Sequence, residues 1–146
     1  MGLISALGHG TIALDTAPFI YFIEEHPDFL PVVAPLFEEV AAGRREIVTS
    51  AVTLLEVLVV PYRIGNLPMA ERYEALLTQS RGLHLVEIDR QQLRAAAQLR
   101  ALYNIRTPDA LQLSAAISRR CRFFVTGDRK LPDLPNLRIL QLHDYL

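Results

Sequence analysis

The sequence predicts an α/β domain whose central sheet is mostly parallel and covered by helices on both faces. Short apolar runs typical of buried strands alternate along the chain with longer stretches typical of helices. The chain has 146 residues, of which 51% are hydrophobic and 21% charged, which excludes a disordered chain and suits one domain. No internal repeat or long linker divides it. We therefore expect a single domain over residues 1–146, and leave open whether residues 1–10 form a flexible extension.

The first part of the chain is expected to contain two strands and three helices. An apolar strand ends at Asp15, where a helix opens that stops before Pro27. Gly43 closes the next helix, and Ser50 suits the N-cap of a helix inside TSAVTLLEVLVV. That last segment is rich in β-branched residues, so a strand stays open as an alternative, although its length favours a helix. These elements are expected at residues 11–14, 16–23, 31–42, 46–49 and 51–60.

The second part of the chain repeats the alternation and is expected to supply three more strands. Pro68 begins a helix that ends before Gly82, and the period-two pattern of LHLVEI predicts a strand. The long helix that follows has Leu93, Ala97 and Leu99 on its expected apolar side. These elements are expected at residues 68–81, 83–88, 91–103, 107–117, 122–126 and 137–140, with Thr107 as the N-cap and Pro108 as the first residue of the last helix.

Charge and cysteine content limit the classes of function. Lys and Arg number 15 against 16 Asp and Glu, and a net charge of −1 argues against a wholly basic nucleic-acid surface but not against a local basic path. Cys121 is the only cysteine, which excludes an intrachain disulfide and a cysteine-built zinc site. The N-terminal residues lack the basic segment of a signal peptide, and no apolar run is long enough to span a bilayer. We therefore expect a cytoplasmic protein that makes no membrane contact.

Four carboxylates stand in apolar surroundings, whereas most other acids lie on polar helix faces. Asp15 ends the first strand, and Glu56 lies in the middle of VTLLEVLVV. Asp109 opens the helix TPDALQLSAAI, and Asp128 follows the strand in FFVTGDRKL. Taken singly, the three aspartates are explained as well by a helix cap, the helix dipole and a turn. Glu56 has no basic residue in local helical reach, so only an exposed polar stripe shared with Thr53 would explain it structurally.

Taken together, the four acids predict a metal site. Because ligands bind at the carboxyl ends of parallel strands, three of the acids should converge at one edge of the sheet, with the fourth on a helix packed nearby. Carboxylates that lie so close repel one another unless hard divalent cations neutralise them. Oxygen-only ligands favour Mg²⁺ or Mn²⁺ over zinc. One or two such ions beside a phosphodiester can activate water and stabilise the leaving oxygen.

The ordered set of acids resembles the PIN-domain ribonuclease family, and within it the VapC-type toxins of bacterial toxin–antitoxin pairs. The matching stretches are LDTAPFIYFIE, TSAVTLLEVLV, TPDALQLSAAI and FVTGDRKL, with their acids 41, 53 and 19 residues apart. The resemblance runs from residue 11 to the C-terminus. It implies a PIN-like three-layer α/β/α sandwich with a central sheet of about five strands.

The resemblance also implies a metal-dependent endoribonuclease that uses Mg²⁺ or Mn²⁺. Asp15 and Asp109 would be the principal metal ligands, and Glu56 would orient metal or water. Asp128 would position a second ion or its water shell. The implied supporting hydroxyls are those of Thr16 and Thr126. Many family members carry a further acid where this chain has Lys130, so the resemblance leaves open whether one metal or two are bound.

Basic residues border the predicted acidic site on two sides. Arg106 precedes Asp109, and Arg129 and Lys130 follow Asp128. One interpretation is that these groups bind the phosphates on either side of the cleaved bond in an RNA. The other is that they belong to solvated loops.

Partners are implied by the same resemblance. It predicts a homodimer and a small antitoxin whose tail lies across the acidic cleft. An apolar surface from FIYF and residues 31–40 would serve that contact, unless those residues belong to the core.

Two other classes of function were weighed. The first is a PIN-like module that binds RNA or protein without cutting it, which Lys130 in place of an acid motivates. The second, a phospho-accepting receiver domain, fits poorly because Thr16 and Ala17 follow Asp15 where paired acids are wanted.

Overall fold

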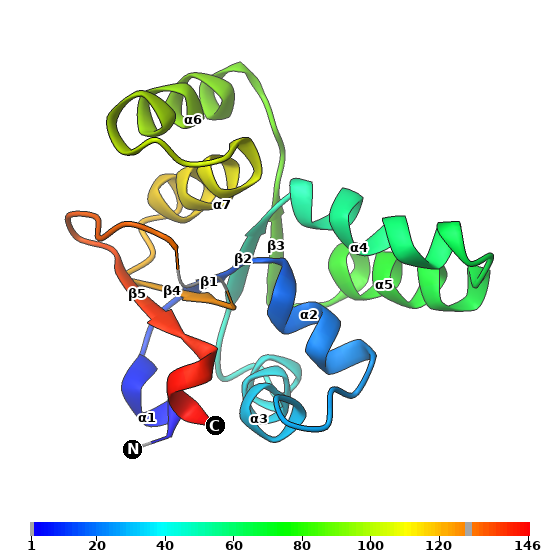
Figure 1. Ribbon diagram of the computed structural model, residues 1–146. Helices are drawn as coiled ribbons and strands as arrows, with labels where there is room; N and C mark the ends of the chain where they lie inside the picture. Colours follow the sequence, from blue (N-terminus) through cyan, green and yellow to red (C-terminus); the bar gives the residue numbers. More distant parts are fainter. Residues whose placement is uncertain (1, 128–129) are drawn as a thin grey trace.

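The computed structural model describes residues 2–127 and 130–146, and it arranges them around one five-stranded sheet (Figure 1). The strands run in the order β3-β2-β1-β4-β5, and every neighbouring pair is parallel. Their bounds are β1 Ile12–Leu14, β2 Ile47–Ser50, β3 Leu83–Val86, β4 Phe123–Thr126 and β5 Arg138–Gln141. The predicted α/β class and the parallel sheet of five strands are confirmed.

Helices cover both faces of this sheet and complete a three-layer sandwich. Their bounds are α1 Leu3–Leu7, α2 Thr16–Ile23, α3 Leu30–Ala41, α4 Val52–Arg63, α5 Leu67–Gln79, α6 Arg90–Tyr103, α7 Thr107–Ser118 and the short 3₁₀ helix η1 Leu142–Tyr145. Figure 1 shows α6 and α7 on one side of the sheet and α2 to α5 on the other. The pair α4 and α5 projects from the body of the molecule as an arm.

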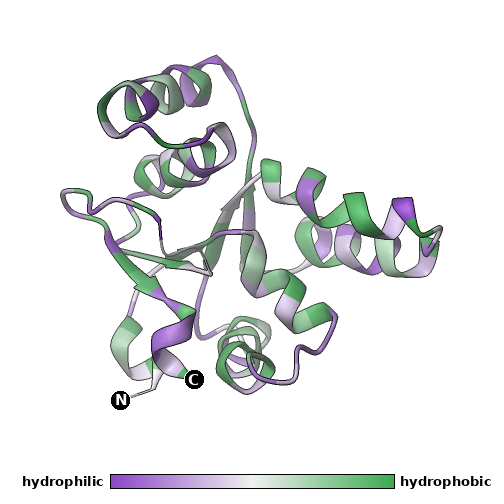
Figure 2. Ribbon diagram, viewed as in Figure 1, coloured by the Kyte–Doolittle hydropathy of each residue, from purple (hydrophilic) through white to green (hydrophobic). Residues whose placement is uncertain are grey.

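The alternation of side chains along β1 explains why the molecule has two cores. Ile12 and Leu14 pack in the core that includes α2, α3 and α5, whereas Ala13 packs in the core under α6 and α7. All three residues are buried, as expected for a central strand that is covered on both faces. Figure 2 shows hydrophobic and hydrophilic residues alternating along the helices, in keeping with helices that cover a core with one side only.

The N-terminal residues fold back onto the domain and do not extend from it. Leu3 and Leu7 of α1 are buried in the larger core, close to the C-terminal η1 (Figure 1). The buried guanidinium of Arg45 donates a hydrogen bond of 2.7 Å to the carbonyl of Gly8 and holds the segment after α1. Residues 2–10 therefore pack against the domain through α1 and the segment that follows it.

Two helices have an N-cap one residue away from the expected one. Ser50 is the last residue of β2, although its hydroxyl still accepts a hydrogen bond of 3.2 Å from the N–H of Val52. Thr107 is the first residue of α7, because Arg106 occupies the N-cap. The alternative of a strand after Ser50 is excluded by α4.

The expected apolar side of α6 was partly wrong. Leu93 has 51% of its surface exposed and Ala97 is exposed too, whereas Leu99 is buried as expected. The side that packs on α7 instead begins at Gln92 and continues through Ala96 to Leu99. Because this side starts with an amide, its apolar pattern was hidden in the sequence.

The sheet order places a switch point beside β1. The chain builds β2 and β3 on one side of β1, and then returns to add β4 and β5 on its other side. In parallel α/β sheets ligands bind at the carboxyl ends of the strands at such a point. Asp15 follows β1 and Gly127 follows β4, so both lie at this edge. None of the described helices is long and apolar enough to cross a membrane.

Candidate functional site

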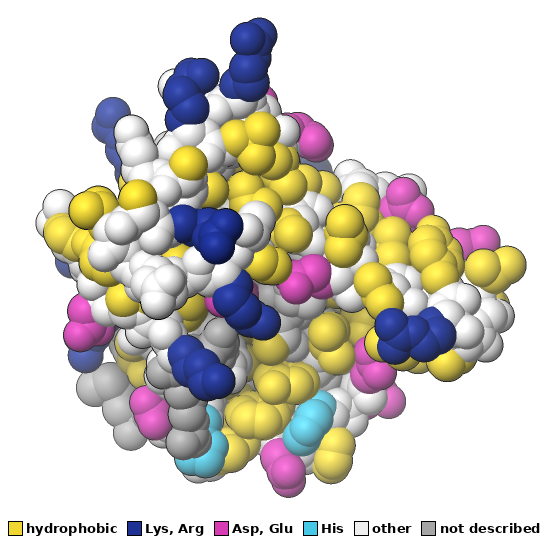
Figure 3. All heavy atoms as spheres, turned by 45° about the horizontal axis from the view of Figure 1, so that its top comes forward, with side chains coloured by type: hydrophobic (Ala, Val, Ile, Leu, Met, Phe, Trp, Pro, Cys, Tyr) yellow, Lys and Arg dark blue, Asp and Glu magenta, His cyan; other side chains and the backbone are white. Residues whose placement is uncertain are grey.

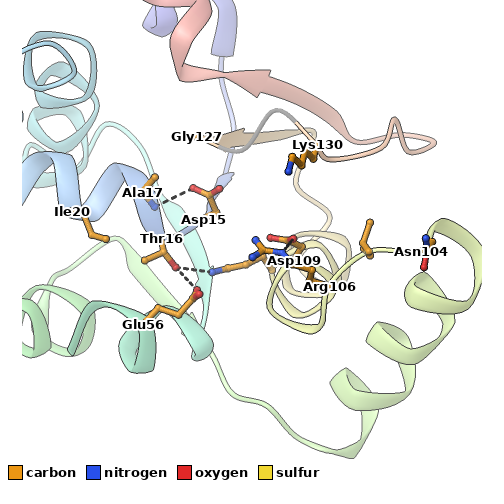
Figure 4. A pocket seen from close by; sticks show the side chains of 12 residues that line it. Asp15, Thr16, Ala17, Ile20, Glu56, Asn104, Arg106, Asp109, Gly127 and Lys130 are labelled. Atoms are coloured by element: carbon orange, nitrogen blue, oxygen red, sulfur yellow. Dashed lines mark hydrogen bonds and ion pairs between the residues drawn. The ribbon is translucent and has the colours of Figure 1, made fainter. Parts of the chain in front are cut away.

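A pocket of about 640 Å³ opens at the carboxyl ends of β1 and β4, with walls from α2, α4 and α7 (Figure 4). Its lining includes six residues that the sequence analysis singled out, namely Asp15, Thr16, Glu56, Arg106, Asp109 and Lys130. A seventh, Thr126, contacts Asp15 from β4. Asp128 and Arg129 lie outside the described residues. The structure thus brings together the predicted site residues that it describes, from four separate segments of the chain.

Asp15 is held by the backbone on both sides of the switch point. Its N–H donates a hydrogen bond of 3.2 Å to the carbonyl of Val125, and its Oδ1 accepts one of 3.3 Å from the N–H of Ala17. The hydroxyl of Thr126 donates to its Oδ2. Asp15 is therefore the N-cap of α2 and also a carboxylate of the pocket, so the two interpretations of this residue are compatible.

The pKa of Asp15 is raised from its ordinary value of 3.8 to about 7. Burial of the carboxylate is the main cause, and the negative charge of Asp109 adds to it. Hydrogen bonds from Thr126 and from the backbone N–H groups of Ala17 and Gly127 lower the pKa, but they do not compensate for burial. The pocket therefore contains a carboxylate whose negative charge lacks full stabilisation in the protein alone.

Glu56 reaches the pocket from α4 and finds its partner on α2. The hydroxyl of Thr16 donates a hydrogen bond of 2.6 Å to Oε1 of Glu56 (Figure 4). Thr53, one turn earlier on α4, is fully buried. The structural alternative for Glu56, an exposed polar stripe shared with Thr53, is therefore wrong. Glu56 instead belongs to a polar layer that connects α4 with the start of α2.

Asp109 lies in the first turn of α7 and is paired with Arg106 at the N-cap of the same helix. Nε of Arg106 donates to Oδ2 of Asp109 at 3.1 Å, and 74% of the Arg106 side chain is exposed against 18% for Asp109. An ion pair with one partner so exposed contributes about 0–1 kcal/mol, so it can be exchanged for another cation at little cost. Arg106 thus lines the pocket and forms an ion pair with Asp109, a predicted metal ligand.

The loop after β4 packs closely against α2. A Cβ on Gly127 would lie 2.9 Å from Cβ of Ala17 and 3.4 Å from the hydroxyl of Tyr21. Burial, with the charge of Asp15 as a smaller cause, raises the pKa of that tyrosine. Lys130 also lines the pocket (Figure 4). Glycine therefore allows the backbone at position 127 to approach α2 this closely.

The sequence analysis missed the floor of the pocket. Gln112 of α7 is only 3% exposed, lines the pocket, and contacts Thr16 and Thr53 through its amide. The signal that would have found it is the single amide inside the apolar run ALQLSAAI, on the same helix as Asp109. A buried amide needs partners, which makes such a residue informative about its surroundings.

The donor chemistry of the pocket suits a hard divalent cation. Its carboxylate and hydroxyl oxygens are the ligands that Mg²⁺ and Mn²⁺ prefer. Within residues 2–127 and 130–146, no three His, Cys, Asp or Glu side chains form a complete metal-binding group. The residues thus fit such an ion in kind, and the fourth predicted acid, Asp128, lies outside the described part of the chain.

The surface around the pocket divides into a basic side and an apolar side. Figure 3 shows dark blue Lys and Arg side chains over the α6 and α7 side of this face, and groups of yellow side chains over the α4–α5 arm, with dark blue and magenta ones among them. The exposed apolar residues on the arm are Leu55, Val59, Val60, Tyr62, Ile64 and Leu67. The apolar surface predicted from FIYF and residues 31–40 is largely core instead, since Phe19, Val33, Leu36, Phe37 and Val40 are buried.

The fold and the pocket define a parallel α/β domain with an acidic site at its switch point, and comparison with known proteins gives the family. The family model of the PIN domain matches residues 12–137, so the chain belongs to the PIN domain family. PIN domains are generally nucleases. No curated protein sequence matches the chain.

Solved structures of three complexes contain chains of the same fold. One is in VapBC2 from Rickettsia felis bound to a promoter DNA fragment, with a TM-score of 0.68, 19% identity, and coverage of 90% of this chain and 98% of that one. A second is in a toxin–antitoxin complex from Klebsiella pneumoniae, with a TM-score of 0.64, 19% identity, and coverage of 86% and 94%. A third is in FitAB bound to the IR36 DNA fragment, with a TM-score of 0.68, 18% identity, and coverage of 90% and 94%. The predicted likeness to VapC-type proteins is thereby confirmed at the level of the fold.

Proposed function

We propose that this chain, as one PIN domain over residues 1–146, is a metal-dependent endoribonuclease and the toxin of a toxin–antitoxin pair. The observation that carries the proposal is that Asp15, Glu56 and Asp109 line one pocket, where burial and the nearby charge of Asp109 raise the pKa of Asp15. A divalent cation would remove both causes of this instability, because it replaces lost hydration and neutralises both acids. Family membership supports nuclease chemistry for such a site.

In the proposed site Asp15 and Asp109 hold Mg²⁺ or Mn²⁺, and Asp128 positions a second ion or its water shell. When bound, the cation supplies an acidified water and positive charge beside the scissile phosphate. Glu56 keeps a carboxylate turned toward the pocket by accepting a hydrogen bond from the Thr16 hydroxyl, so it can orient the attacking water. Hydrolysis leaves a 5′-phosphate and a 3′-hydroxyl.

Basic side chains at the rim would position the RNA. Arg106 and Lys130 both line the pocket (Figure 4), and Arg129 belongs to the same proposed set. Phosphate contacts from such groups fix the register of a strand without reading its sequence. They would place one phosphodiester over the carboxylates while the flanking phosphates stay at the rim.

The test uses the protein purified free of partner and assayed on structured RNAs with Mg²⁺, Mn²⁺ or EDTA. Cleavage is expected with either metal and is expected to stop with EDTA. Asp15→Asn and Asp109→Asn should each lower kcat by at least about 100-fold, because each removes a charge from the metal site. Metal-independent cleavage, or cleavage that both variants leave unchanged, would contradict the proposed mechanism.

The proposed partners are an RNA substrate, a second copy of the chain and a cognate antitoxin, all met in the cytoplasm. The exposed apolar residues of the α4–α5 arm supply a surface for a protein partner, since large contiguous apolar surfaces mark interaction sites. Leu55→Glu places a charge on this surface without touching the buried side of α4. Light scattering should then show a smaller mass than for the wild-type protein. An unchanged mass would show that the arm is not part of the dimer contact.

A second candidate function is a PIN-like module that binds RNA or protein without cutting. It is favoured by Lys130, which lines the pocket where many relatives carry an acid and would occupy part of a second metal position. Calorimetric titration with Mn²⁺ alongside the ribonuclease assay separates the two functions. Metal binding with turnover eliminates the module, and RNA binding without metal binding or turnover favours it.

A further inference from the structure

We infer that Gln112 is a positioning residue for the pocket, and that it fixes Thr16, Glu56 and the carboxyl end of β1 through one buried hydrogen-bond network. The inference rests on the proposed function, because it assigns to Gln112 a role in the same site. The network joins β2, α4, α7 and α2 directly beneath the pocket. Its fully or almost fully buried members are Thr49, Ser50, Thr53 and Gln112.

The orientation of the Gln112 amide follows from one backbone contact. The N–H of Ser50 lies 3.2 Å from the atom assigned as Oε1, and a backbone N–H can only donate. The carbonyl oxygen of the amide must therefore face Ser50. Its NH₂ group then faces Thr53, at 2.7 Å, and Thr16, at 3.4 Å. Both hydrogens of the amide are used, one toward each threonine.

This orientation determines the direction of the hydrogen bond to Glu56. The Thr16 hydroxyl accepts from Gln112 on one side, and its single proton is then available on the other side for Oε1 of Glu56 at 2.6 Å. The carboxylate of Glu56 is thus anchored through Thr16 to a residue that cannot move in the core. Without the amide, the Thr16 hydroxyl is free to rotate and the position of Glu56 is no longer defined.

The second arm of the network reaches the backbone next to Asp15. Thr53 accepts from Gln112 and lies 2.6 Å from the hydroxyl of Thr49, which donates to the carbonyl of Leu14 at 2.8 Å. Leu14 is the last residue of β1, and Asp15 follows it. One buried amide therefore supports the chain at both Asp15 and Glu56, which come from elements far apart in the sequence.

A second buried glutamine supplies a matched control. Gln92 of α6 is 8% exposed and accepts a hydrogen bond of 3.0 Å from the hydroxyl of Ser114, which lies on α7 two residues after Gln112. This pair connects α6 with α7 and does not line the pocket. Gln92 and Gln112 are thus both buried glutamines. Gln92 packs against α7 and Gln112 lies on it, but only Gln112 contacts residues of the site.

The experiment compares Gln112→Met with Gln92→Met in the full chain. Both substitutions keep the length of the side chain and remove its hydrogen bonds, so both should lower the melting temperature. Only Gln112→Met should also lower kcat and Mn²⁺ affinity, each by about 10- to 100-fold, as is typical when a partner of a metal-site residue is removed. KM for RNA should change by less than about threefold, because the rim residues that bind phosphates are untouched. Gln112→Glu, which in its ionised form keeps the acceptor and removes both donors, is the second variant and, assayed at about pH 8, should show the same loss.

A crystal structure of Gln112→Met without metal tests the geometry separately from activity. The contact of 2.6 Å between Thr16 and Glu56 is expected to be lost or to occur in several conformers. If that contact persists unchanged, or if both methionine variants lose kcat equally, the inference is overturned. If the wild-type protein neither binds Mn²⁺ nor cuts RNA while the contact depends on Gln112, the proposed function fails and the positioning role stands.

Discussion

Asp15→Asn should make the metal-free protein more stable than the wild-type protein, and the gain should grow with pH. The substitution removes the charge that the pocket destabilises while it keeps the size of the side chain. Asparagine is also as good an N-cap as aspartate, so the hydrogen bond from the N–H of Ala17 to the start of α2 is retained. The hydroxyl of Thr126 can accept from an amide as readily as it donates to a carboxylate.

The magnitude follows from the difference between the folded and unfolded pKa of Asp15. The value is raised to about 7 in the folded chain from an ordinary 3.8, and at about 1.4 kcal/mol for each pH unit this corresponds to about 4 kcal/mol. The folded state binds the proton more tightly than the unfolded state. The wild-type protein therefore has its full stability from this group below the unfolded pKa, and loses it as pH rises through the folded pKa.

The assay is thermal or denaturant unfolding of both proteins in EDTA, between about pH 4 and about pH 8. The two proteins should be nearly equal in stability at the acid end. Above about pH 7 the variant should be more stable by about 4 kcal/mol, or about 8–16 °C in melting temperature for a domain of this size. Comparison at each pH cancels the other titrating groups.

Saturating Mn²⁺ should reverse the order of stability. The wild-type protein gains by mass action because the ion binds only the folded state, and the variant gains little because it lacks a ligand charge. A stability difference in EDTA that is independent of pH, or a wild-type protein that is more stable than Asp15→Asn in EDTA at about pH 8, would refute the reasoning about a desolvated carboxylate.

Three further predictions concern the rim, the loop after β4 and the metal. Arg106→Gln should raise Mn²⁺ affinity severalfold, because Arg106 and the ion compete for Asp109, and should raise KM for RNA by weakening a phosphate contact. Titration calorimetry measures the affinity and steady-state kinetics measure KM. Weaker Mn²⁺ binding by the variant would contradict the competition for Asp109. Gly127→Ala should cost about 1–3 kcal/mol of unfolding free energy, because its Cβ would overlap that of Ala17, whereas Gly2→Ala, which meets no atom within 4 Å, should cost little. The rise in wild-type melting temperature on adding Mn²⁺ should be larger at about pH 8 than at about pH 5, because protons compete with the ion for Asp15. Equal rises at the two pH values would contradict this competition.

Local patterns were sufficient for most elements of the fold. The apolar strand that ends at Asp15, the glycine after α3 and the proline near the start of α7 each act within a few residues, so the sequence shows them directly. The face of α6 was misjudged because its packing side includes Gln92, whose burial depends on a hydroxyl from another helix. The N-caps of α4 and α7 were displaced by one residue, since neighbouring residues can exchange the role of cap.

Some features of the site could be predicted from the sequence, and others depended on the fold. The identity and order of Asp15, Glu56 and Asp109, and the chemistry of oxygen ligands, could be predicted because acids are rare in apolar segments. Which atoms meet could not be predicted. The hydrogen bond from Thr16 to Glu56 spans 40 residues, and that from Gln112 to Thr16 spans 96. Such contacts exist only because the order of the parallel strands brings α2, α4 and α7 to one edge of the sheet.

The sequence by itself determined the class of fold, the acids available for chemistry and the family that the chain resembles. Only the tertiary structure decided that Asp15 is desolvated beside Asp109, that Arg106 holds Asp109, and that a buried amide orients the hydroxyl beside Glu56. The physical reason is that residue type and spacing encode local conformation, whereas a pKa or the direction of a hydrogen bond depends on every group that folding packs around an atom.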